Sequence, residues 1–368
     1  MNINPYQLFT LIVFFESSTA IAVGTGSGAK QAAWIAILIG MFAGIPLFLL
    51  YHYLYQKFPE KPLISYSQII LGKYLGWLIG IIYVLYFIYI ASRDLRDFGS
   101  LVGVTLLANT PLLIINMFMI VAVAYAIGKG IEELGRLAEF FFIPTIILST
   151  VFITVFLYFS KVIEWDRLLP FLGDGWKSIL TTAFPLTFTF PFGEMIVFTM
   201  ILPNLNQKKM ALKTGLAGMV FSGLLISCVL VLEIMVLGTF GIQNSLFPLI
   251  QTVGLIHIDF LTRLDAIAVI ILLFGVFFKV SVFYYAALLG TADLFKIKNK
   301  NQLLIPIGFI ILLSSILIAS NISEHLEEGL KIVPYYLHLP LQVGIPFLLF
   351  VVTLIRNRLK TKHRMKNG

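Results

Sequence analysis

Long apolar runs separated by short polar segments dominate this chain of 368 residues. A helix needs about 20 predominantly apolar residues to cross a lipid bilayer, and ten suitable runs alternate with polar connections. These runs cover residues 5–23, 31–56, 74–92, 112–128, 140–160, 178–207, 214–238, 266–292, 301–323 and 332–355. We therefore predict an all-α integral membrane protein with ten transmembrane helices, in which residues 1–368 form a single polytopic membrane domain.

The sixth run is interrupted in its middle, where the sequence reads AFPLTFTFPFGEMIVF. Pro185, Pro191 and Gly193 fall in this stretch, and Glu194 follows the glycine directly. A proline inside a helix removes a backbone donor, and in hydrocarbon the freed groups must find protein or water partners. The stretch is typical of the broken helices that form transporter substrate sites. A kinked helix of purely structural value is the alternative, because proline and glycine are common in membrane spans.

Glu16 occupies a comparable place in the first run, within the sequence FFESSTAIAVGTGSG. Ser17, Ser18 and Thr19 follow it, and their hydroxyls could satisfy an unwound turn or simply pack between helices. Glu16 and Glu194 each follow an aromatic-rich apolar run, and close to half the chain separates them. Corresponding interrupted spans in two halves of a chain are typical of inverted-repeat transporters.

We therefore predict two inverted five-helix repeats, with helices 1 and 6 broken at the membrane midplane. The repeats would cover about residues 5–160 and about residues 178–357. Most Lys and Arg residues lie in the connections after the even-numbered runs and in the tail 356–368. Because basic loops stay on the cytoplasmic side, both termini are predicted to be cytoplasmic. The basic tail is expected to contact anionic lipid headgroups.

Lys279 is the most informative ionisable residue within a span. It has 13 uncharged residues on each side, so at about 1.5 Å per residue its ammonium lies about 20 Å from either charged end. Burying such a charge costs at least about 3 kcal/mol on insertion scales, which predicts a partner or a wet cavity. A structural ion pair between two helices is the alternative. Glu233 also lies within a run, and we leave its role open.

Two further segments have weaker interpretations. The sequence SRDLRDF at the end of the third run holds Arg93, Asp94, Arg96 and Asp97, which we interpret as an interfacial charge cluster. Residues 244–258 are apolar but short and contain a proline. Such a segment fits a re-entrant or interfacial helix better than an additional span.

Composition and motifs exclude several classes of function. The chain is 59% hydrophobic and 12% charged, about half the charge of a soluble domain. The net charge of +8 sits in short loops and the tail, so no nucleic-acid partner is expected. A single cysteine and five scattered histidines predict neither a disulfide nor a metal site. H-E-x-x-H and G-x-S-x-G motifs are absent, and we expect neither an enzyme nor a cofactor.

Several blocks in succession resemble the spore germination permease family, the B-type subunit of bacterial germinant receptors. The blocks are AWIAILIGMFAG at 33–44, LRDFGSLVGVTLLANTPL at 95–112, YAIGKGIEELGRLAEFFFIP at 125–144, FPFGEMIVF at 190–198 and GVFFKVSVFYYAALLG at 275–290. The resemblance implies a ten-helix fold of the amino acid–polyamine–organocation transporter superfamily, with helices one and six broken around the ligand. It also implies the spore inner membrane, or a cell membrane, as the location. The implied partners are an A-type subunit, a C-type lipoprotein and a small nutrient, such as an amino acid, sugar or nucleoside.

The resemblance places the unwound turn of helix one at residues 15–20, where Glu16 replaces the glycine-rich turn of related transporters. Lys279 would face helix one from helix eight, where sodium-coupled relatives hold a cation. We hypothesise that Lys279 substitutes for that cation, paired with Glu16. The predicted ligand site lies at the midplane and comprises Glu16, Ser17, Ser18, Thr19, Tyr86, Tyr89, Thr187, Phe188, Thr189, Phe190, Gly193, Glu194, Tyr284 and Tyr285.

The predicted function is that of a germinant-sensing, transporter-like membrane subunit that binds an amino acid or another small nutrient and signals germination. One alternative is a proton-coupled amino-acid transporter that uses Glu16, Glu194 or Lys279 as the proton carrier. A second alternative is a conduit for ions or small solutes that partner subunits open.

Overall fold

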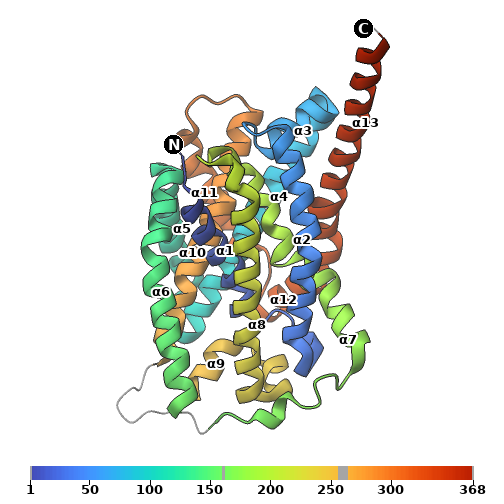
Figure 1. The fold of residues 1–368 in the computed structure, drawn as a ribbon. Helices are drawn as coiled ribbons and strands as arrows, with labels where there is room; N and C mark the ends of the chain where they lie inside the picture. The colour runs from blue at the N-terminus through green and yellow to red at the C-terminus, as the bar shows by residue number, and fades with distance from the viewer. Residues whose placement is uncertain (1, 160–161, 256–263, 367–368) are drawn as a thin grey trace.

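The computed structural model describes residues 2–159, 162–255 and 264–366 (Figure 1). Apart from an isolated bridge between Ile3 and Leu205, these residues form helices and connections and contain no strand. The α-helices are α1 (Pro5–Ala22), α2 (Ala33–Lys57), α3 (Leu63–Leu71), α4 (Lys73–Thr105), α5 (Leu112–Lys129), α6 (Ile131–Phe159), α7 (Gly175–Thr182), α8 (Ala211–Asn244), α9 (Pro248–Gly254), α10 (Leu264–Leu294), α11 (Leu304–Leu317), α12 (Ile322–Glu327) and α13 (Ile345–Lys366). Short 3-10 and π segments lie between them: η1 (Ser27–Ala32), η2 (Trp165–Leu168), η3 (Ala183–Thr187), η4 (Phe192–Met200), η5 (Leu202–Asn204), η6 (Lys208–Met210), η7 (Lys300–Leu303), η8 (Glu328–Ile332) and η9 (Pro334–Gly344).

Many of these helices are long and apolar enough to cross a membrane. Within the described residues, eight helical segments meet that requirement by length and composition. They cover Ser27–Lys57, Lys73–Thr105, Leu112–Lys129, Gly175–Met200, Lys208–Asn244, Asp265–Leu294, Lys300–Leu317 and Pro334–Arg358. The chain is therefore a multi-pass membrane protein. The helices α1 and α6 fall outside this set, so the count of ten spans stays a prediction.

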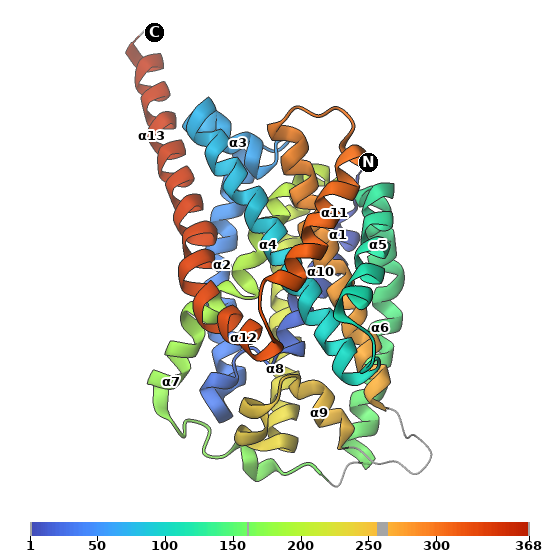
Figure 2. The same cartoon turned by 180° about the vertical axis from the view of Figure 1, so that it is seen from behind.

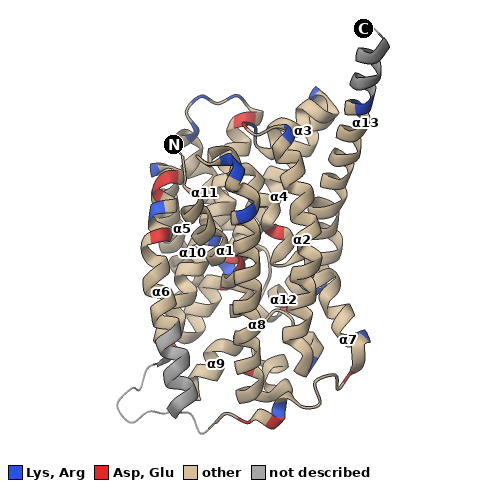
Figure 3. Cartoon of the chain, in the orientation of Figure 1, with Lys and Arg blue, Asp and Glu red and all other residues tan. Residues whose placement is uncertain are grey.

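The helices α1 and α10 lie at the centre of the bundle (Figures 1 and 2). α10 packs against α4 and α1, and α1 also packs against α8. α5 and α6 lie on one side of this centre, and α2 and α13 lie on the other. The start of α1 and the end of α13 are at the same end of the bundle, where most Lys and Arg residues also gather (Figure 3).

α1 is one continuous helix, so the predicted break at residues 15–20 is wrong. The interior of α1 contains no proline or glycine. The hydroxyls of Ser17 and Ser18 donate to backbone carbonyl oxygens about one turn earlier, at 2.6 and 3.2 Å, and thereby stay within the helix. After α1 ends, Gly24 and Gly26 adopt φ angles of 61° and 106°, in the left-handed region that favours glycine.

The predicted interruption of the sixth span is confirmed. The backbone at Phe184 is extended, with φ −120° and ψ 125°, between α7 and the 3-10 segment η4. Pro185 follows immediately and has no N–H to donate. The Thr187 hydroxyl donates to the carbonyl oxygen of Ala36 at 2.7 Å. This bond holds the interrupted segment against α2.

The close packing of α2 on this segment gives a first prediction. A Cβ added to Gly40 would lie 2.7 Å from the Thr187 carbonyl carbon and 2.8 Å from its oxygen. We expect Gly40→Ala to destabilise the fold by about 1–3 kcal/mol, because overpacking forces backbone shifts. The control is Gly103→Ala on α4, where the added Cβ would meet Ile115 Cδ1 at an ordinary 3.7 Å. Equal thermal unfolding temperatures for the two variants would contradict the prediction.

Candidate functional site

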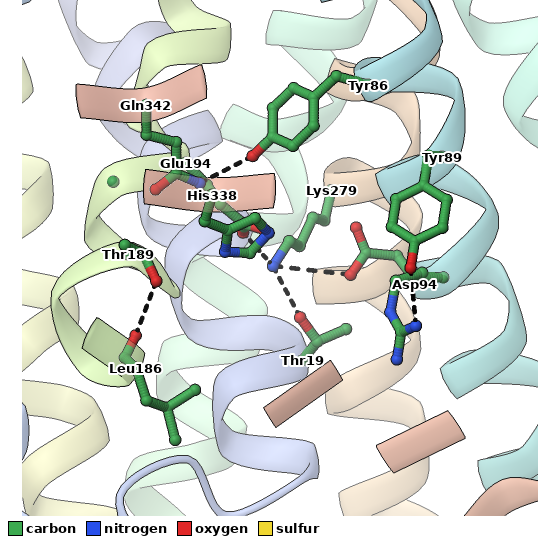
Figure 4. Close-up of polar contacts among 12 residues, drawn as sticks. Thr19, Tyr86, Tyr89, Asp94, Leu186, Thr189, Glu194, Lys279, His338 and Gln342 are labelled. Atoms are coloured by element: carbon green, nitrogen blue, oxygen red, sulfur yellow. Dashed lines mark hydrogen bonds and ion pairs between the residues drawn. The ribbon is translucent and has the colours of Figure 1, made fainter. Parts of the chain in front are cut away.

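The side-chain ammonium of Lys279 is the centre of a buried polar cluster (Figure 4). Its Nζ lies 2.7 Å from Glu194 Oε2 and 3.6 Å from Asp94 Oδ1, and it donates a hydrogen bond to Thr19 Oγ1 at 2.8 Å. These partners come from η4, α4 and α1, whereas Lys279 itself belongs to α10. One ammonium therefore joins four segments that are far apart in the sequence.

Two aromatic rings complete the surroundings of the ammonium. Its nitrogen lies 4.4 Å from the ring centroid of Phe190 and 5.3 Å from that of Phe15. A cation over an aromatic ring is attracted by the negative face of that ring, more strongly when both are desolvated. Phe190 belongs to the interrupted sixth span, so the interruption supplies both a carboxylate and an aromatic face to the same cation.

The cluster borders a cavity of about 40 Å³. Its polar lining is formed by Arg93, Asp94, Asp97, Glu194, His325 and His338. Asp94 Oδ2 has no hydrogen-bond partner among the described residues. Because a buried polar atom normally has such a partner, this oxygen is an available acceptor at the site.

The short helix α12 and the π segment η8 form a cover over the site, because both contribute residues to the lining of the cavity. The Arg93 guanidinium donates to the backbone oxygen of His325, and also to Tyr89 Oη at 3.2 Å. Nε2 of His325 lies 2.9 Å from Asp97 Oδ1. The two contacts of His325 join α12 to α4, which carries Arg93 and Asp97. The cover is therefore held by the same helix that supplies Asp94.

Local hydrogen bonds fix the first turn of α12. Asn321 Oδ1 accepts from the Glu324 amide at 2.9 Å, and the Ser320 amide donates to the Glu324 carboxylate at 2.8 Å. The bond from Ser320 is the main reason why the pKa of the exposed Glu324 carboxyl lies below its ordinary value. A capped helix start places His325 reproducibly over the cavity.

A second hydrogen-bonded group supports the start of η4. Tyr51 Oη donates to the backbone oxygens of Gln342 and Gly193, at 2.6 and 3.2 Å. Gln342 Nε2 in turn donates to Tyr86 Oη at 2.8 Å. The Gln342 side chain lies so close to Gly193 that an added Cβ would collide with its amide oxygen. Glycine at this position therefore allows η9 to pack against the interruption that presents Glu194.

Glu16 is fully buried on α1 but does not pair with Lys279. In the described part of the chain, the ion pairs of Lys279 run to Glu194 and Asp94, so the hypothesised pair with Glu16 is wrong. Neither Glu16 carboxylate oxygen has a hydrogen-bond partner among these residues. Thr19, in contrast, accepts a hydrogen bond from the Lys279 ammonium.

The other predicted site residues divide into two groups. Tyr86 packs edge-on against His338 and Tyr89 accepts a hydrogen bond from Arg93, and both partners line the cavity. Phe190, Gly193 and Glu194 belong to the interruption beside it. The second group makes contacts elsewhere in the bundle: Ser17 and Ser18 line a different cavity, Thr187 bonds to α2, Thr189 bonds to Pro185 O, Phe188 packs near Phe184, Tyr284 bonds to Leu304 O and Tyr285 accepts from Lys300.

Asp94, His338 and Gln342 were not among the predicted site residues. Asp94 belongs to the sequence SRDLRDF, whose interpretation as an interfacial cluster is wrong because α4 continues to Thr105 and buries these charges. The sequence did not indicate that these charges are buried, because charges at the end of an apolar run usually mark the end of a span. His338 Nε2 lies 3.9 Å from Glu194 Oε1, and no sequence pattern indicated this proximity.

Comparisons with known proteins agree with this architecture. The family model described as "Spore germination protein" matches residues 2–323. The chain is 41% identical to spore germination protein KB of Bacillus subtilis (strain 168) over 359 residues, which cover 97% of this chain and 96% of that protein. It is 28% identical to spore germination protein YndE of the same organism, with 76% of each chain covered.

A solved structure shows the class of fold. The crystal structure of MhsT in complex with L-phenylalanine superposes with a TM-score of 0.69 and 13% sequence identity, covering 94% of this chain and 87% of that one. The chain is therefore a multi-pass membrane protein that shares the fold of MhsT. By its sequence, it belongs to the spore germination protein family.

The ion cluster gives a second prediction. Lys279→Met would leave Glu194 and Asp94 facing an apolar side chain, and removing one partner of a buried ion pair costs about 3–5 kcal/mol. We expect a clearly lower thermal unfolding temperature for the reconstituted chain. Adding Glu194→Gln to that variant should recover part of the loss. A double variant that is no more stable than Lys279→Met would contradict the pairing.

Proposed function

We propose that this chain is the transporter-like, germinant-sensing membrane subunit of a spore germinant receptor. The observation that carries the proposal is the convergence of an ammonium and two carboxylates, from Lys279, Glu194 and Asp94, beside a cavity where four segments meet. Ionisable groups inside a membrane domain are costly and mark ligand or ion sites. Membership of the spore germination protein family and the likeness to a transporter structure support the same conclusion.

The charges at the site suit a zwitterionic amino acid. Its ammonium would approach Asp94, whose Oδ2 has no hydrogen-bond partner among the described residues. Its carboxylate would be attracted by Arg93, which lines the cavity, and by Lys279, which lies in the adjoining ion cluster. The cavity of about 40 Å³ is small for such a ligand. We infer that the structure represents a closed conformation, in which α12 and η8 must move before a nutrient binds.

Signalling would follow from this movement. A ligand shifts a conformational equilibrium only through its different affinities for the two conformations. Lys279 would substitute for the cation of sodium-coupled transporters, because its fixed charge already joins α10 to α1 through Thr19. Ligand binding would then require no sodium.

The proposed partners are the A-type and C-type subunits of a germinant receptor and the lipids of the spore inner membrane or cell membrane. Both termini would face the cytoplasm, in agreement with the common location of the start of α1, the end of α13 and most basic residues. The tail 356–368 would contact anionic lipid. We retain a single membrane domain with two inverted repeats, about 5–160 and 178–357, as part of this proposal.

A proton-coupled amino-acid transporter is the second candidate function. It is supported by the likeness to MhsT and by buried carboxyl groups at Glu16 and Glu194. Net transport separates the two candidates, because a sensor needs only saturable binding. In a conduit opened by partner subunits, changes at a pore-facing Glu194 would instead alter ion release without altering ligand affinity.

Binding and uptake by the reconstituted chain provide the test. Radiolabelled proteinogenic amino acids are measured singly for saturable binding, and then for accumulation in proteoliposomes with and without a pH gradient. We expect binding without accumulation, unchanged when sodium is replaced by choline. Asp94→Asn should weaken binding about tenfold or more, because it removes a buried charge partner.

The matched control for this experiment is Asp174→Asn, at an exposed ion pair with Lys30. It should bind like the wild type. Accumulation driven by a pH gradient would favour the transporter, and dependence on sodium would contradict the role proposed for Lys279. No saturable binding of any amino acid would contradict an amino-acid ligand.

A further inference from the structure

A second, larger cavity of about 110 Å³ lies on another side of α1. Five helices, α1, α6, α8, α9 and α10, contribute to its walls. Ser17 and Ser18 line it, whereas the next residue, Thr19, bonds to the ammonium of Lys279. The segment 244–258, predicted to form a re-entrant or interfacial helix, contains α9, which contributes to the wall of this cavity. Residues 256–258 of that segment lie outside the described residues. The cavity is thus separate from the site proposed for the nutrient.

Two buried polar groups of this cavity lack partners. Glu233 on α8 is fully buried, and neither of its carboxylate oxygens has a hydrogen-bond partner among the described residues. The hydroxyl of Thr252 on α9 is also buried and equally without a partner in that part of the chain. Ser17 and Ser18 differ, because their hydroxyls are already bonded to the backbone of α1. An unpartnered carboxyl group in a membrane domain is costly, which indicates that a ligand completes this site.

The lining limits the chemistry of such a ligand. Thr145 and Ser149 of α6 also line the cavity, and the remaining walls are apolar and include Val13, Phe14 and Leu272. Hard cations such as Mg²⁺ or Ca²⁺ are held chiefly by several carboxylate and carbonyl oxygens, and Glu233 is the one carboxylate among the described residues that line this cavity. A ligand carboxylate would be repelled by Glu233. A ligand with an ammonium group and a short hydrocarbon chain would donate hydrogen bonds to the carboxyl group and the hydroxyl, and its chain would pack against the apolar walls.

The volume sets the size of that body. An engineered apolar cavity of about 150 Å³ binds benzene, so a cavity of about 110 Å³ suits a molecule of about five non-hydrogen atoms. We propose that this cavity binds a small primary alkylamine. Its ammonium lies between Glu233 and the Thr252 hydroxyl, and its hydrocarbon chain lies against Val13, Phe14 and Leu272.

The test is equilibrium binding of radiolabelled n-butylamine to the full chain in nanodiscs of zwitterionic lipid, with empty nanodiscs subtracted. We expect saturable binding that unlabelled n-butylamine displaces and that 1-butanol and butyrate do not displace at equal concentration. Glu233→Gln should weaken binding about tenfold or more. Thr252→Val keeps the shape of the side chain, removes the hydroxyl and should weaken binding to a smaller extent.

The matched control is Glu139→Gln on α6, a helix that also lines the cavity. Glu139 accepts a hydrogen bond from Gln7 at 3.0 Å and is not part of the cavity wall, so this variant should bind like the wild type. If Glu233→Gln does not fold, Thr252→Val decides the question. Absence of saturable binding, equal displacement by 1-butanol, or wild-type affinity in every folded cavity variant would overturn the proposal.

Discussion

The burial of one ammonium group constrains much of this fold. A lysine near the middle of an apolar span cannot reach water along its own helix, so its charge requires partners inside the bundle. The partners of Lys279 come from α1, α4 and η4. Each of these segments must present one polar atom at the same depth. This requirement fixes the rotation of α4, the position of Thr19 on α1 and the depth of the interruption in the sixth span.

The interruption is therefore more than a kink. It turns Glu194 and Phe190 toward the same cation, and Gln342 packs against Gly193 where a larger residue would collide. On the other side of the site, Arg93 and Asp97 hold α12 through His325. The same helix, α4, thus contributes to the ion cluster and to its cover. Under the proposed function, movement of the cover would therefore be coupled to rearrangement of the cluster, as a conformational sensor requires.

The sequence allowed the helical membrane fold, the broken sixth span and the need of Lys279 for buried partners to be predicted, because apolar length, proline positions and an isolated charge within a span act locally. It did not reveal the partners of Lys279. Asp94 was misplaced because charge clusters usually end spans, whereas α4 continues beyond this one. The break in α1 was wrong because its interior contains no proline or glycine, and the hydroxyls of Ser17 and Ser18 bond within the helix rather than to an unwound turn. Which face of a helix meets which neighbour depends on tertiary packing, and a single sequence does not contain that information directly.

The most direct test of the central claim is the germination response of spores whose subunit carries Asp94→Asn, with abundance of the subunit measured by immunoblot. The variant keeps the pair between Lys279 and Glu194, so the account predicts normal abundance. It also predicts a nutrient concentration for half-maximal germination that is about tenfold higher or more. Asp174→Asn spores provide the reference for an exposed acid. An unchanged response at normal abundance would contradict the placement of the nutrient site at this cluster.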